Sequence, residues 1–162
     1  MVHQVHIILF LLNAAAVLAA ALVDTFTRKI PNIFVVIMLC CSVTFWATAG
    51  IAPIFSHLIS GVYAGAVGFL LFVRGKIGGG DVKMITALAT WFVPQQLVMF
   101  VLWVLMCGGI IGALYLALIA LRLFLERFTP KIPLPNIDPK AGMAYGLATA
   151  CGFAVSAWRV FA

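Results

Sequence analysis

The stretch Leu97–Leu121 contains no charged side chain. It is long enough to cross the hydrocarbon core of a bilayer, even when tilted, because a transmembrane helix needs about 20 apolar residues. The whole chain has the same character: 65% of its residues are hydrophobic and 9% are charged, whereas a soluble domain typically carries about 25% charged residues. The chain is therefore predicted to be an integral membrane protein, an all-α polytopic bundle of membrane helices.

Six apolar segments are predicted to cross the membrane. The polar regions between them are too short to form a second folded domain, so residues 1–162 are interpreted as a single membrane domain. One segment is short, because ten residues span only about 15 Å, half of a hydrocarbon core. The six segments are His6–Val23, Pro31–Thr48, residues 54–73, the short Met84–Val93, Leu97–Leu121 and Ala141–Val160.

Two local patterns predict how the segments pack and where the chain leaves them. Gly61, Gly65 and Gly68 lie four and three residues apart, so they share one helical face and permit close contact with another helix. The polar stretch Arg122–Lys140 contains four prolines, which forbid a continuous helix. This stretch is predicted to be a loop on the membrane surface.

The basic residues predict the orientation. Cytoplasmic loops of membrane proteins carry an excess of Lys and Arg, and six crossings leave only Arg159 on the opposite side. If Met84–Val93 re-entered without crossing, Arg122–Lys140 would lie outside. We therefore expect both termini outside, the short segment crossing the membrane, and one basic cytoplasmic side. That side carries Arg28, Lys29, Arg74, Lys76, Lys83, Arg122, Arg127, Lys131 and Lys140.

Composition and motifs argue against several other functions. The net charge of +6 is scattered between apolar segments, so topology explains it better than nucleic-acid binding does. The cysteines fall in apolar segments without C-x-x-C spacing, and no H-E-x-x-H or G-x-S-x-G is present. No metal, other cofactor or disulfide is predicted. These free cysteines are Cys40, Cys41, Cys107 and Cys151.

The chain has only four carboxylates, and the predicted topology puts two of them, Asp24 and Asp81, at the same cytoplasmic depth. Ionisable groups at bilayer depth are costly and indicate function by default. Two adjacent carboxylates can share a proton, which supplies a base that activates water and an acid that protonates a leaving amine. The alternative interpretation is structural: Asp81 caps a helix N-terminus, and Asp24 pairs with Arg28. Glu126 and Asp138 are interpreted as loop charges.

Three motifs together resemble the type IV prepilin peptidase family of membrane aspartic proteases. They are Asp24 followed by Arg28-Lys29-Ile30-Pro31-Asn32, the G-x-G-D-x-K pattern of Gly78-Gly79-Gly80-Asp81-Val82-Lys83, and Tyr145-Gly146 near the start of the last segment. The resemblance covers nearly the whole chain. In length and order it is greatest to the short forms that serve tight-adherence pili.

The resemblance implies roles for particular residues. Asp24 and Asp81 would be the catalytic pair, Gly78 and Gly80 the motif glycines, and Lys83 a residue that tunes Asp81 or helps to position substrate. The substrate would be a prepilin or pseudopilin, cut at the cytoplasmic face between a basic leader and a hydrophobic helix, with membrane lipid as a further partner.

The chain departs from the family in two places. It reads Met143-Ala144-Tyr145-Gly146 where relatives commonly have proline before the tyrosine, which leaves Tyr145 only a candidate for substrate binding. It also lacks the cysteine-bearing insert of larger, methylating members, so methyltransferase activity is not expected. The alternative functions are a small transporter, in which a helix broken near Asp81 lines a polar path, and a noncatalytic subunit of a membrane assembly.

Overall fold

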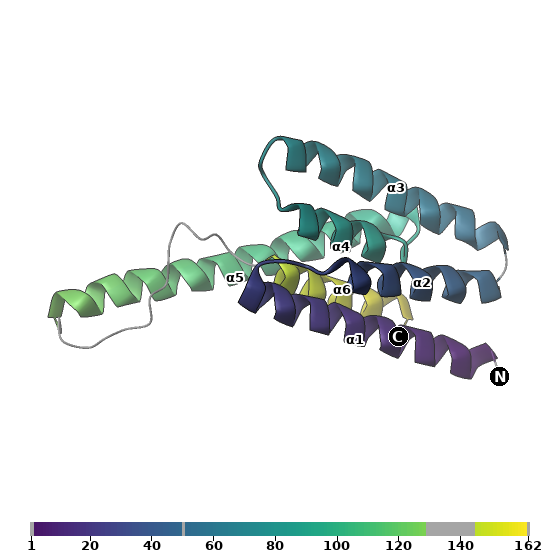
Figure 1. The fold of residues 1–162 in the computed structure, drawn as a ribbon, viewed down its shortest axis with the longest axis horizontal. Coiled ribbons are helices and arrows are strands. Elements are labelled where there is room, and N and C mark those ends of the chain that lie inside the picture. The colour runs from purple at the N-terminus through teal and green to yellow at the C-terminus, as the bar shows by residue number, and fades with distance from the viewer. Residues whose placement is uncertain (1, 50, 129–144, 162) are drawn as a thin grey trace.

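The computed structural model describes residues 2–49, 51–128 and 145–161. Within these ranges the chain forms six helices and no strand (Figure 1). The predicted all-α class is thereby confirmed. The helices are α1 (Val2–Thr27), α2 (Asn32–Ala49), α3 (Ile51–Val73), α4 (Gly79–Ala89), α5 (Pro94–Phe128) and α6 (Gly146–Phe161).

Three of the described helices, α1, α3 and α5, are long and apolar enough to cross a membrane. The apolar part of α2 is shorter, at Asn32–Thr48. Helix α4 has 11 residues, which span about 16 Å and cannot cross a hydrocarbon core of about 30 Å alone. The six predicted crossings therefore remain a prediction, whereas the membrane character of the chain is supported by helix length and composition.

Successive helices run in alternating directions, as Figure 1 shows. The end of α1 and the starts of α4 and α6 consequently lie at one end of the bundle. Helix α4 lies in the middle, in contact with α2, α3 and α6, while α6 packs against both α1 and α5. This arrangement brings the segments that carry Asp24, Asp81 and Tyr145 to the same end.

The predicted glycine face of α3 is confirmed. It packs so closely against α4 and Thr90, the residue that follows α4, that a Cβ atom added at any of the three glycines would crowd a side chain there. The separations would be 2.6 Å between Gly61 and Thr90, 3.3 Å between Gly65 and Thr86, and 3.0 Å between Gly68 and Val82. Small residues let two helix backbones approach, and here they fix α4 in place.

The short helix differs from its prediction at both ends. Expected at Met84–Val93, it begins at Gly79 and ends at Ala89. Gly79 and Gly80 are therefore helical, although glycine is a poor helix former. Beyond Ala89 the chain turns, and Trp91 and Phe92 are fully buried there.

Helix α5 also continues past its predicted end. It runs to Phe128, so the stretch after Leu121 begins as helix rather than as the expected loop. Arg, Leu and Glu are good helix formers, and no proline lies between Leu121 and Pro130. At 35 residues, α5 is about 52 Å long, and its last turns project beyond the bundle (Figure 1). The rest of the predicted loop, including Asp138, lies outside the described residues.

Candidate functional site

Asp24 lies near the end of α1 and is buried, with 6% of its surface exposed. Its Oδ2 accepts a hydrogen bond of 3.0 Å from the backbone N–H of Gly146, the first residue of α6. The first N–H groups of a helix have no partner within the helix, and they favour negative charge. The start of α6 therefore supplies the donor for this buried carboxylate.

Gly146 leaves no space for a side chain at this contact. A Cβ atom there would lie 2.8 Å from Asp24 Oδ2 and 3.3 Å from the Ala21 Cα. In the sequence, Gly146 stood out only as the neighbour of Tyr145, and its contact with Asp24 was not predicted. The available signal was a glycine at the start of the last apolar segment, where close backbone approach requires the absence of a side chain.

Asp81 lies in the first turn of α4 and is partly buried. Gly78 is the N-cap residue, without a side-chain cap, and its backbone N–H donates a hydrogen bond to the Asp81 carboxylate. The predicted capping role of Asp81 is thus present. It does not exclude a chemical role, because the charge of Asp24 also acts on this carboxylate.

The pKa of Asp81 is raised from 3.8 to about 6. Burial is the largest cause, the negative charge of Asp24 is the second, and the hydrogen bond from Gly78 opposes both. Asp81 lies outside the three helices that are long enough to span a membrane. A carboxyl group with this pKa can exchange a proton near neutral pH, as acid–base catalysis requires.

The two aspartates line one polar hollow of about 360 Å³. Its wall combines the loop after α1 with the glycine run before and within α4. The lining residues are Asp24, Arg28, Lys29, Ile30, Gly78, Gly79, Gly80, Asp81 and Lys83. The structure therefore brings together the predicted residues of the first two motifs.

The loop after α1 closes tightly on the N-terminus of α4. A Cβ atom at Gly80 would lie 3.3 Å from the Ile30 Cβ, and Ile30 itself is buried. The chain leaves α1 at Arg28, whose φ of 54° is left-handed, although its backbone N–H still donates a hydrogen bond of 2.8 Å to the Asp24 backbone oxygen. The basic loop and the glycine run thus form one rim.

Lys83 has a partner other than the aspartates. Its Nζ donates a hydrogen bond of 3.1 Å to Asn32 Oδ1 at the start of α2. This contact links α4 to α2 beside the polar hollow, which Lys83 also lines. The predicted influence of Lys83 on Asp81 or on substrate stays a prediction.

Tyr145 immediately precedes α6 and packs against α5. A Cβ atom at Gly108 would lie 3.1 Å from the Tyr145 ring and from its hydroxyl oxygen. Tyr145 does not line the polar hollow with Asp24; it lines a separate apolar hollow together with Asp81. The third motif therefore reaches Asp24 through Gly146, whereas Tyr145 lies outside the polar hollow.

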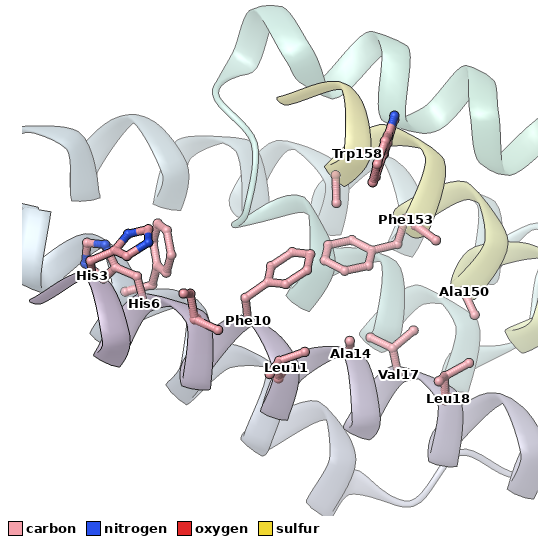
Figure 2. Close-up of a pocket in the computed structure, with 14 residues that line it drawn as sticks. His3, His6, Phe10, Leu11, Ala14, Val17, Leu18, Ala150, Phe153 and Trp158 are labelled. Atoms are coloured by element: carbon pink, nitrogen blue, oxygen red, sulfur yellow. The ribbon is translucent and has the colours of Figure 1, made fainter. Parts of the chain in front are cut away.

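A larger hollow, of about 660 Å³, lies between α1 and α6. In Figure 2, Phe10 and Phe153 point toward one another across it, and His3 and His6 lie toward one end. No described carboxylate lines this hollow. This hollow therefore lacks the pair of carboxyl groups that lines the smaller polar hollow.

The comparisons with known proteins agree with these motifs. The model of the type IV leader peptidase family matches residues 11–113. This region includes Asp24, the glycine run and Asp81, and it ends before Tyr145. No curated protein and no solved structure matched the chain.

Proposed function

The chain belongs to the type IV leader peptidase family, and from this premise we propose that it is an aspartic endopeptidase with Asp24 and Asp81 as its catalytic pair. It removes the leader from type IV prepilins or pseudopilins of the tight-adherence type. Cleavage occurs at the cytoplasmic face of a bacterial inner membrane. The proposal goes beyond the family assignment in naming the catalytic class, the residues and the pilus type.

The observation that carries the proposal is that Asp24 and Asp81 line the same polar hollow. They come from different helices, and burial first and the charge of Asp24 second raise the pKa of Asp81. Like charges at close range cannot both be ionised at low cost, so one proton is shared. Peptide hydrolysis by an aspartic peptidase uses such a pair.

The environments of the two carboxyl groups favour different starting roles. Each carboxyl group accepts a backbone N–H, Asp24 from Gly146 and Asp81 from Gly78, so the pKa of Asp81 is what distinguishes them. The raised pKa of Asp81 favours the protonated form. We therefore assign Asp24 as the base and Asp81 as the acid in the first step.

In that step, Asp24 takes a proton from water, and the water oxygen attacks the scissile carbonyl carbon. The Asp81 carboxyl group donates its proton to the carbonyl oxygen, which gives a neutral tetrahedral diol. In the second step, Asp24 donates its proton to the amide nitrogen and the C–N bond breaks. Asp81 then recovers a proton from the diol as the new carboxyl group forms, so both side chains return to their starting states.

A cleavage assay tests this function. The full chain, purified in detergent, would be incubated with a prepilin-like substrate that has a basic leader followed by an apolar helix. The masses of the products would be measured by mass spectrometry. We expect two products, cut in front of the apolar helix, with no methyl group added when S-adenosylmethionine is supplied. An intact substrate would contradict the peptidase assignment, and a methylated product would contradict the absence of methyltransferase activity.

A further inference from the structure

Asp81 lines two hollows of opposite character. One is the polar hollow that it shares with Asp24. The other, also about 360 Å³, is an apolar groove between α3 and α5. Among the described residues that line the groove, Asp81 is the only charged one, so a carboxyl group of the proposed catalytic pair forms part of its wall.

The groove is accessible from the side of the bundle. Its walls come from α3 and α5, both long enough to span a membrane. Large apolar side chains on both walls, such as Tyr63, Val98 and Leu105, are more than half exposed. Exposed apolar surface on membrane-spanning helices faces acyl chains or another apolar helix, so an occupant can enter from within the bilayer.

We propose that this groove binds the apolar helix that follows the scissile bond, so that the substrate enters sideways between α3 and α5. The inference rests on the proposed function and adds the location of the substrate helix. A basic leader followed by an apolar helix needs a polar space next to an apolar one. Asp81 is the described residue that lines both spaces, and a peptide bond at the junction of leader and helix would lie beside it.

The two hollows also divide the substrate by chemistry. The polar hollow has the basic residues Arg28 and Lys29 on its rim, and burying an apolar helix against charged groups gains little. The described lining of the groove offers few hydrogen-bonding side chains, namely the hydroxyls of Tyr63 and Tyr145 and the carboxyl group of Asp81. An apolar helix with internally satisfied backbone groups suits such a groove, whereas a polar leader does not.

Two adjacent positions on α5 give a matched test. Leu105 lines the groove, whereas Met106 does not, and each is 56% exposed. We expect Leu105→Trp to raise KM for the helix-bearing substrate about tenfold, because the larger side chain occupies the groove, with kcat nearly unchanged. Met106→Trp should leave both constants within about twofold of the parental values. Leu11→Trp, in the hollow between α1 and α6, is a second control.

A photoreactive cross-linking residue at position 105 or 106 provides a measurement that does not depend on turnover. Position 105 should cross-link to the apolar helix of the substrate, and position 106 should not. Two results would overturn the proposed location of the substrate helix. One is an equal change in KM for Leu105→Trp and Met106→Trp. The other is cross-linking of position 105 only to lipid or to a second copy of this chain. Failure of the parental protein to cleave any substrate would instead overturn the proposed function.

Discussion

The backbone N–H of Gly146 donates a hydrogen bond of 3.0 Å to the Asp24 carboxylate, which joins the start of α6 to the end of α1. The bond joins residues far apart in the sequence and leaves no room for a Cβ atom. It orients one carboxyl group of the proposed pair. Helix α6 therefore contributes to the candidate site through its backbone.

Gly146→Ala should impair cleavage strongly. The added methyl group would lie 2.8 Å from Asp24 Oδ2, so the carboxyl group or α6 must move, and a displacement of about 1 Å can cost about 100-fold in rate. The matched control is Gly109→Ala, because a Cβ atom at Gly109 meets nothing within 4 Å. The cleavage rates of the two variants are compared, and we expect Gly146→Ala to be much slower than Gly109→Ala. Equal rates would show that cleavage does not need the close contact at Gly146.

Lys83 should act together with Asn32, its hydrogen-bond partner. Lys83→Met and Asn32→Ala should each reduce activity, and the double variant should lose little more than either single one, since both remove the same contact. A single hydrogen bond is worth about 1 kcal/mol, so reductions of less than about tenfold are expected. Additive losses would indicate that Lys83 acts on Asp81 or on substrate independently of Asn32.

The raised pKa of Asp81 predicts a pH-dependent contribution to stability. The folded state favours the protonated carboxyl group, so its contribution is fully present below the ordinary pKa of 3.8 and is lost as pH rises through about 6. Asp81→Asn removes this dependence. Relative to the parental protein, the variant should gain thermal stability as pH rises from about 4 to about 7. If the difference in Tm between the variant and the parental protein stayed constant over this pH range, the raised pKa of Asp81 would be contradicted.

Cysteine labelling tests the orientation. In a background without the native cysteines, Lys76→Cys in the loop between α3 and α4 should resist an impermeant reagent in intact cells, and His3→Cys should react. Both side chains are exposed, so a difference reports the side of the membrane rather than burial. Reaction of Lys76→Cys from outside would reverse the predicted topology and the cytoplasmic location of the aspartates.

Much of the fold was predictable because apolar length and glycine spacing act locally. The helical segments followed from uninterrupted apolar runs, and the shared face of Gly61, Gly65 and Gly68 followed from helical periodicity. Helix α4 was harder, because helix propensity argues against Gly79 and Gly80. Their packing against Phe72 and Ile30 is tertiary information that overrides propensity.

The candidate site was predictable only where side chains carry its chemistry. Asp24 and Asp81 were identifiable as rare carboxylates at one depth, and the structure brings them to one hollow. The contact of Asp24 with Gly146 was not predictable, because a backbone N–H is present at almost every position and only the packing of α6 selects this one. The separation of Tyr145 from the polar hollow likewise depends on its packing against Gly108.

The catalytic pair is tested most directly by exchanging each aspartate for asparagine in the cleavage assay. An amide is nearly the same size as a carboxyl group but can neither accept nor donate the required proton, so Asp24→Asn and Asp81→Asn should each abolish cleavage in protein that is folded and inserted. The double variant should lose little more, because residues that act as a unit are not additive. Glu126→Gln and Asp138→Asn, whose side chains lie outside the described residues, should retain most activity. Folded, inserted Asp81→Asn protein that cleaves its substrate near the parental rate would contradict the account.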